Sequence, residues 1–149
     1  MFRISQYMRE LAQAQATGTY PVPARRGSGQ PPGPVVIWNL IRRCNLTCKH
    51  CYSISADKDF AGELDTGEVF KVMDELKAFR VPVLILSGGE PLLRPDIFEI
   101  AGRAKKMGFY VGLSSNGTLI DESNIDAIAA ADFDYVGVSL DGIRETHDK

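Results

Sequence analysis

The sequence has very little cysteine, and all of it is confined to one place. Its 149 residues contain three cysteines, all within residues 44–51, and no other part of the chain has one. Three cysteines so close together do not make the disulfide framework of a small secreted protein. We predict a reducing, cytoplasmic setting, in which clustered thiols favour metal binding over disulfides.

The chain also lacks long apolar runs and a marked excess of either charge. No stretch approaches the roughly 20 apolar residues of a transmembrane helix, and residues 1–11 lack the apolar core and cleavage site of a signal peptide. The formal net charge is −2, with 44% hydrophobic and 24% charged residues. This composition is ordinary for a globular domain and gives no reason to expect a nucleic-acid or membrane partner.

Proline and glycine are concentrated near the N-terminus, in residues 17–34. Proline fixes φ and glycine adds backbone freedom, so this stretch favours an extended linker. A short helix is predicted before it, within residues 5–16. We therefore divide the chain into an N-terminal segment with its linker, residues 1–34, and a core domain, residues 35–149.

From residue 35 onward, apolar β-rich runs alternate with helical patterns. The runs predict strands at residues 35–41, 83–86, 109–113 and 135–140. The helical spacing predicts helices at about residues 66–80, 95–107 and 121–131. Asp65 and Glu68 form a capping-box pattern before the first of these helices. Alternation of strands and helices is typical of βαβ units with a parallel sheet.

An unusual polar segment directly follows each predicted strand. These segments are residues 44–51, 87–91, 114–118 and 139–142. The carboxyl ends of parallel strands share one edge of a sheet, and that edge carries the active site in α/β folds. We therefore expect four segments that are distant in sequence to surround one pocket.

The cysteines have the spacing C-x3-C-x2-C, at Cys44, Cys48 and Cys51. A zinc site is one interpretation, although His50 is a poor fourth ligand because it adjoins the third cysteine. An iron–sulfur cluster held by three thiolates, with one iron free for a small ligand, fits better. The arginines at 42–43 either favour the thiolate forms or are solvated surface charges.

The other segments offer polar groups to an organic ligand. Gly88 and Gly89 let the backbone approach closely and leave N–H groups free, while Glu90 can accept hydrogen bonds from a ligand ammonium group. Residues 114–116 supply short donors and acceptors suited to ribose hydroxyls or a carboxylate. Both stretches also suit ordinary turns. Ser139 is a weaker candidate of the same kind.

C-x3-C-x2-C after the first strand, with Gly-Gly-Glu-Pro after the second, resembles the radical S-adenosylmethionine (SAM) enzymes. The resemblance covers residues 35–149. It implies an α/β fold, the N-terminal part of a partial (β/α)6 TIM-like barrel with parallel strands, truncated after about four strands. We therefore expect an N-terminal fragment of an enzyme, inactive by itself.

The resemblance also implies two cofactors, a [4Fe–4S] cluster and SAM. Cys44, Cys48 and Cys51 would hold the cluster, and the methionyl amine and carboxylate of SAM would chelate its fourth iron. The other residues that the resemblance implies for SAM are Gly88, Gly89 and Glu90 at the ammonium, Ser115 and Asn116 near the carboxylate and ribose, Ser139 near the ribose, and His50 and Tyr52 near the adenine.

The amino-acid sequence of residues 38–52 and 81–96 is similar to that of family members in heme d1 biosynthesis. This implies a tetrapyrrole substrate, a siroheme derivative that loses propionate side chains after hydrogen abstraction by a 5′-deoxyadenosyl radical. It also implies a reductant such as flavodoxin or ferredoxin. A heme-pathway decarboxylase and a peptide maturase are alternatives within the family. A non-catalytic iron–sulfur or zinc-binding module is the alternative from another class.

Overall fold

The structure is a computed structural model that describes residues 33–142. The chain divides into two units, Met1–Pro31 and Pro32–Lys149, and all described residues belong to the second. The helix predicted within residues 5–16 and most of the predicted linker therefore lie outside the described residues.

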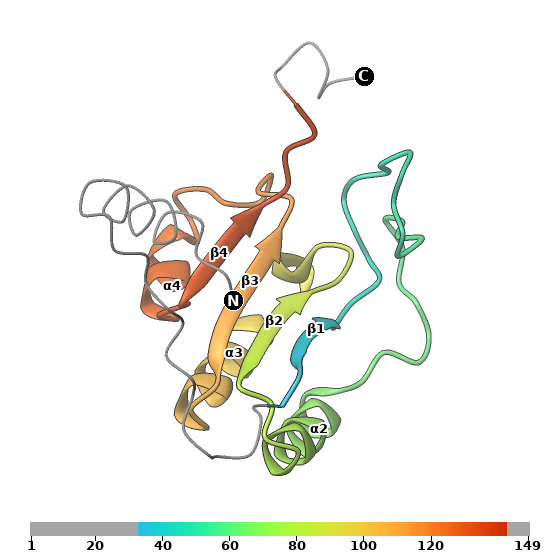
Figure 1. Cartoon of the computed structure of the whole chain (residues 1–149). Coiled ribbons are helices and arrows are strands. Elements are labelled where there is room, and N and C mark those ends of the chain that lie inside the picture. Colours follow the sequence, from blue (N-terminus) through green and yellow to red (C-terminus); the bar gives the residue numbers. More distant parts are fainter. Residues whose placement is uncertain (1–32, 143–149) are drawn as a thin grey trace, which may run out of the picture. The chain divides into compact units, whose positions relative to one another are not determined.

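A parallel four-stranded sheet forms the frame of the second unit. Its strands β1 (Val35–Asn39), β2 (Val83–Ser87), β3 (Tyr110–Ser115) and β4 (Tyr135–Val138) lie in the order β1-β2-β3-β4. Every neighbouring pair is parallel, with Trp38 opposite Leu86 and Leu86 opposite Leu113. All four strands therefore end at the same edge, as the arrows in Figure 1 show. The predicted parallel α/β sheet is confirmed.

The helices follow the predicted pattern with two differences. They are α2 (Thr66–Ala78), α3 (Ile97–Lys106) and α4 (Ile125–Ala130), and a 3-10 turn, η1 (Pro91–Leu93), was not predicted. The capping box is confirmed, since Asp65 accepts from the Glu68 N–H and Glu68 accepts from the Asp65 N–H. The predicted helix at 121–131 was too long at its start. There the Asp121 carboxylate accepts from the N–H and hydroxyl of Ser123, which closes a turn instead.

The core lies between the sheet and the helices α2 and α3. The fully buried side chains include Leu84 and Leu86 from β2, Met73 from α2 and Ile100 from α3. Each such side chain stabilises the fold by about 1.5–3 kcal/mol relative to exposure. All five residues of β2 are buried, whereas the edge strands β1 and β4 are more exposed. The best-buried part of the fold is therefore the centre of the sheet, next to the edge at which the strands end.

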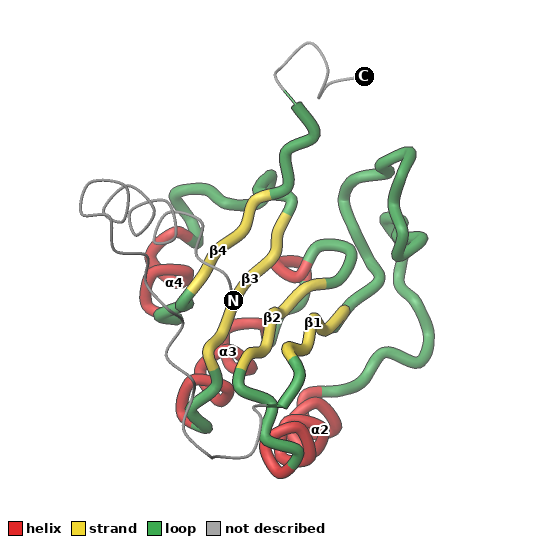
Figure 2. The backbone as a smooth tube through the Cα atoms, in the orientation of Figure 1, coloured by secondary structure: helices red, strands yellow, loops and turns green. Residues whose placement is uncertain are grey.

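Between β1 and α2 the chain runs through residues 40–65, here called the cysteine segment, without a helix or strand (Figure 2). The segment's only regular backbone feature among the described residues is an isolated parallel bridge between Arg43 and Ala56.

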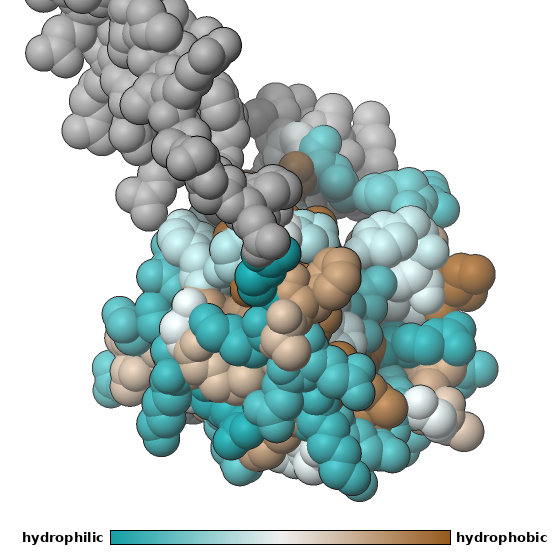
Figure 3. Space-filling model, turned by 60° about the horizontal axis from the view of Figure 1, so that its bottom comes forward, coloured by the Kyte–Doolittle hydropathy of each residue, from teal (hydrophilic) through white to brown (hydrophobic). Residues whose placement is uncertain are grey.

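At the amino ends of the strands, hydrophilic residues predominate on the face turned forward in Figure 3. Within residues 33–142, no helix is long and apolar enough to cross a membrane.

Candidate functional site

The polar segments that follow the four strands meet around one cavity of about 280 Å³. All of the site residues predicted from the sequence contribute to its wall except Glu90. Those in the wall are Cys44, Cys48, Cys51, His50, Tyr52, Gly88, Gly89, Ser115, Asn116 and Ser139. The expected convergence of segments distant in sequence is therefore what the fold produces.

The three cysteines are free and differ in exposure: Cys44 is buried, Cys51 half-buried and Cys48 exposed. Cys44 Sγ accepts hydrogen bonds from the Leu46 N–H at 3.4 Å and from Asn116 Nδ2 at 3.7 Å. No group of three or more His, Cys, Asp or Glu residues in the described part of the chain is arranged as a metal site. The cavity thus gathers three thiols around one space without placing them as a finished ligand set.

Two serines after the third cysteine favour its ionised form. A hydrogen bond with the Ser53 hydroxyl at 3.3 Å and, next in size, one with the Ser55 backbone lower the pKa of Cys51 to about 7. The Ser53 and Ser55 hydroxyls are themselves 2.7 Å apart. The thiolate is the form of a cysteine that binds metals, so the pKa is shifted in the direction that metal binding by Cys51 would require. Neither serine was predicted from the sequence, where the only signal for them is the alternation Cys-Tyr-Ser-Ile-Ser.

The guanidinium groups of the two arginines before the first cysteine contact other side chains of the cysteine segment and not the thiols. Arg43 pairs with Asp57 at 2.9 Å and with Asp59 at 3.2 Å, and the hydrogen bond to Asp57 is the main reason why the pKa of Arg43 is raised. The Arg42 guanidinium lies 4.2 Å from the centre of the Phe60 ring. Both side chains therefore join the start of the cysteine segment to residues 57–60 of the same segment.

Gly88 and Gly89 permit a close approach, as predicted, and the chain they approach is the cysteine segment. Gly89 N–H donates to the Ile41 carbonyl at 2.7 Å, and Glu90 N–H donates to the Arg43 carbonyl at 2.9 Å. A Cβ on Gly88 would collide with the Ile41 carbonyl oxygen, and one on Gly89 with that of Arg43. The expectation of a free N–H group is therefore wrong for Gly89. The N–H groups of residues 89 and 90 instead bind the part of the chain that leads to the first cysteine.

Glu90 lies behind the cavity wall and has no exposed surface. Its carboxylate accepts from the Ser115 hydroxyl at 2.9 Å, the Asn116 N–H at 2.8 Å and the Leu92 N–H at 3.0 Å. The side chain thus joins the segment after β2 to the end of β3. A direct contact between this carboxylate and a ligand ammonium stays a prediction.

A network of amides joins the cysteine segment to the end of β3. Asn116 Nδ2 donates to Asn45 Oδ1 at 2.9 Å, and Asn45 Nδ2 donates to the Thr118 hydroxyl at 2.8 Å. The Thr118 N–H and hydroxyl donate to Asn116 Oδ1 at 2.9 and 2.7 Å. Asn45 was missed because a residue between the first two cysteines carries no signal of its own. These contacts fix the Asn116 side chain next to Cys44.

The remaining predicted residues lie on the outer part of the wall. His50 Nε2 is 3.4 Å from an Asp141 carboxylate oxygen, and the Tyr52 hydroxyl donates to Asn39 Oδ1 at 3.2 Å. Ser139 N–H donates to the Ser115 carbonyl at 3.0 Å, which extends the pairing of β3 and β4. With 76% of its surface exposed, Tyr52 is free to contact a bound molecule.

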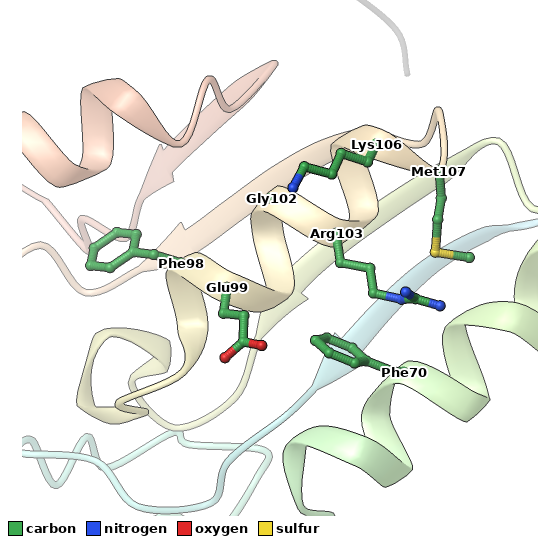
Figure 4. A pocket seen from close by; sticks show the side chains of 7 residues that line it. All are labelled: Phe70, Phe98, Glu99, Gly102, Arg103, Lys106 and Met107. Atoms are coloured by element: carbon green, nitrogen blue, oxygen red, sulfur yellow. The ribbon is translucent and has the colours of Figure 1, made fainter.

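A larger hollow of about 520 Å³ lies between α2 and α3 (Figure 4). The Arg103 guanidinium lies 4.9 Å from the centre of the Phe70 ring and donates to Asp74 at 3.0 Å. This hollow contains none of the polar segments that follow the strands. We therefore place the candidate site in the smaller cavity.

Comparison with known proteins gives consistent matches. Residues 38–149 match the Radical SAM superfamily model. The chain is 50% identical over 148 residues to the pre-heme d1 synthase of Dinoroseobacter shibae, covering 99% of this chain and 35% of that protein. It is 49% identical over 116 residues to the Fe-coproporphyrin III synthase of Methanosarcina barkeri, covering 78% of this chain and 29% of that protein. The chain thus spans about a third of the length of these relatives.

Among solved structures, Streptococcus suis SuiB bound to S-adenosylmethionine has a similar fold. The TM-score is 0.60 at 18% sequence identity, covering 91% of this chain and 29% of that one. At this identity the likeness concerns the fold alone.

Proposed function

The chain belongs to the radical SAM superfamily, and from this premise we propose that it carries the cofactor-binding part of an enzyme of heme d1 biosynthesis. The substrate would be a siroheme derivative that loses propionate side chains. The observation that supports this choice is the 50% identity to a pre-heme d1 synthase over nearly the whole chain. A reducing cytoplasm and a reductant such as flavodoxin or ferredoxin complete the proposal.

Family membership gives a [4Fe–4S] cluster and SAM as cofactors. The donor set of the cavity fits such a cluster, because three thiols and no fourth line one space. We assign Cys44, Cys48 and Cys51 to three irons, which leaves the fourth iron for SAM. When bound and reduced, such a cluster would supply the one electron needed to cleave SAM into methionine and a 5′-deoxyadenosyl radical, and that radical would abstract hydrogen from the substrate.

The task of the chain itself is to bind and orient SAM and to keep water away from it. We assign the methionyl ammonium to residues 88–90, where Glu90 stands behind the wall and orients the end of β3. The other assignments are Ser115 and Asn116 near the carboxylate and ribose, Ser139 near the ribose, and His50 and Tyr52 near the adenine. The support for this arrangement is that all of these residues except Glu90 line the same cavity.

Anaerobic reconstitution of the full-length protein with iron, sulfide, reductant, SAM and a siroheme derivative tests the proposal. We expect 5′-deoxyadenosine, and a tetrapyrrole whose mass falls by the lost propionate groups. An intact cluster that yields no 5′-deoxyadenosine would refute the enzymatic function. If SAM also leaves the electron paramagnetic resonance spectrum unchanged, a non-catalytic iron–sulfur module is favoured; bound zinc would favour a zinc module.

A second function is supported by the 49% identity to an Fe-coproporphyrin III synthase, nearly as high as the first but over less of the chain. The same assay separates the two, because formation of Fe-coproporphyrin III from a siroheme derivative would favour the second. Turnover of a peptide instead of a tetrapyrrole would favour a peptide maturase.

A further inference from the structure

The two ends of the cysteine segment are held by a single side chain. Arg94, which follows η1 and is 7% exposed, donates from Nη1 to the Leu40 carbonyl at 3.0 Å. Its Nη2 donates to the Leu64 carbonyl at 2.9 Å. Leu40 opens the cysteine segment and Leu64 lies at its close. One guanidinium therefore sets the distance between the exit from β1 and the entry to α2.

The Asp96 carboxylate fixes the orientation of the Arg94 guanidinium. Its two carboxylate oxygens accept from Arg94 Nε at 2.7 Å and from Arg94 Nη2 at 3.0 Å. The Thr66 hydroxyl donates to the same carboxylate at 2.7 Å, which ties it to the first residue of α2. A bidentate pair of this kind fixes direction as well as charge, and a buried charge is tolerated when all of its hydrogen bonds are made.

The same short stretch, residues 88–96, also holds the chain that leads to the first cysteine. Its groups donate to the carbonyls of Leu40, Ile41 and Arg43, from the Arg94 guanidinium, the Gly89 N–H and the Glu90 N–H respectively. Three of the four carbonyls before Cys44 are thus fixed from outside the cysteine segment. Because that segment has no helix or strand of its own, its path depends on these contacts.

We propose that Arg94 and Asp96 are positioning residues for the metal site, which act by fixing both ends of the cysteine segment. The inference rests on the proposed function in so far as the cysteines hold a cluster. Neither residue lines the cavity, so their effect is on where the thiols lie and not on which groups bind. A guanidinium is required because three separate acceptors surround it, and an ammonium group lacks the planar fork that reaches them together.

The test uses Arg94→Lys, which keeps the charge and loses the fork, and Asp96→Asn, which keeps the shape and loses the charge. Arg103→Lys is the matched control, because Arg103 also pairs with an aspartate but on the exposed surface. The rate of iron loss to a chelator is measured anaerobically on the reconstituted protein, at a temperature where circular dichroism shows every variant folded. Loss of a partner that orients a metal ligand typically costs 10–100-fold in metal affinity. We therefore expect iron loss about 10–100-fold faster in Arg94→Lys, an intermediate rate in Asp96→Asn and the wild-type rate in Arg103→Lys.

A lowered unfolding temperature with a wild-type rate of iron loss in folded Arg94→Lys would overturn the proposal and leave a purely structural role. If Arg94→Lys does not fold, Asp96→Asn and Thr66→Ala decide the question by the same rates. Hydrogen–deuterium exchange of the metal-free protein adds a readout that needs no cluster. Faster exchange confined to residues 40–65 is expected in Arg94→Lys, and unchanged exchange there would contradict the inference. Failure of the wild-type protein to bind iron would refute the proposed function, and hydrogen–deuterium exchange of residues 40–65 in metal-free Arg94→Lys would still decide whether Arg94 fixes the cysteine segment.

Discussion

The segments that leave β1 and β2 start side by side at the same edge and differ in almost every other respect. The cysteine segment is long and largely exposed. Residues 88–96 are short and contain two buried charged groups, Glu90 with no exposed surface and Arg94 at 7%. The exposed segment carries the thiols, and the buried one contacts the cysteine segment, α2 and β3. The proposed metal ligands and the residues proposed to position them thus lie in different stretches of the chain.

The physical reason for this division lies in solvation. Metal ligands must be reached by ions and by a cofactor, so the stretch proposed to bear them is expected to be exposed. A buried charge costs several kcal/mol unless it is fully paired, and a paired one is fixed in place by the same hydrogen bonds. The rigidity of residues 88–96 therefore comes from what their burial requires.

Removal of a ligand from the exposed segment should have the largest effect on the metal and the smallest on the fold. In Cys48→Ala we expect complete loss of the cluster, because three thiolates are the minimum set proposed here. Because Cys48 is exposed, the free energy of unfolding of the metal-free protein should change by only about 0.5 kcal/mol or less. Iron and sulfide analysis with chemical denaturation checks both. Iron and sulfide at wild-type levels would refute the ligand assignment.

Removal of the buried carboxylate should have the opposite profile. Glu90→Ala leaves the Ser115 hydroxyl, the Asn116 N–H and the Leu92 N–H without their acceptor. Each unsatisfied buried group costs about 1–3 kcal/mol. Because two of the three contacts are only part-buried, we expect a loss near the low end of the summed cost, about 3–5 kcal/mol, in a urea titration. The matched change on the exposed segment, Asp59→Ala, should cost about 0–1 kcal/mol, because Asp59 forms only a surface ion pair. Equal losses in the two variants would remove the contrast between the segments.

The glycines offer a paired test of how closely the two segments approach. In Gly89→Ala the new Cβ would meet the backbone carbonyl oxygens of Arg42 and Arg43, which cannot rotate away. Overpacking of this kind costs about 1–3 kcal/mol. Gly102→Ala on α3 meets nothing and should stabilise the helix by about 0.5–1 kcal/mol. Thermal unfolding of both variants checks the sign of each change, and a stabilised Gly89→Ala would show that the segments are not in contact.

The smallest expected effect depends on pH. Burial raises the pKa of Asp96, but hydrogen bonds from Arg94 and Thr66 outweigh it and hold the pKa below its usual range. The stabilisation by Asp96 is therefore complete above the usual value of about 3.9 and is lost as the pH falls through the lower folded value. We expect the difference in unfolding free energy between wild type and Asp96→Asn to be constant above about pH 5 and to shrink below about pH 4. Urea titrations across this range measure it, and a difference independent of pH would contradict the assignment.

The frame of the fold could be predicted because its signals are local. Apolar runs located the four strands, and the pattern Asp65-x-x-Glu68 located the start of α2. The convergence of the site followed from a general rule about parallel strands, which needs no knowledge of side-chain contacts. The start of α4 was misplaced because Asp121 can cap a turn as readily as a helix.

The contacts within the site could not be predicted, because they join residues far apart in the sequence. Arg94 lies 54 positions from Leu40, and nothing between Leu93 and Pro95 indicates that its guanidinium is buried. Glu90 has a side chain suited to a ligand, and only the fold reveals that β3 supplies its donors. The glycines at 88–89 were correctly predicted to allow a close approach to the backbone. That the approaching chain is the cysteine segment could be seen only in the tertiary structure.

The order of the strands in the sheet is the same as their order along the chain. Each new strand can therefore pair with one that the ribosome has already made, and the unit grows from one side during translation. The thiols emerge first, and the residues that position them follow after roughly 40 more, which at about 5–20 residues per second is a delay of several seconds. During that interval the nascent thiols have no neighbouring segment to hold them, so their protection from oxygen depends on the redox state of the surrounding solution.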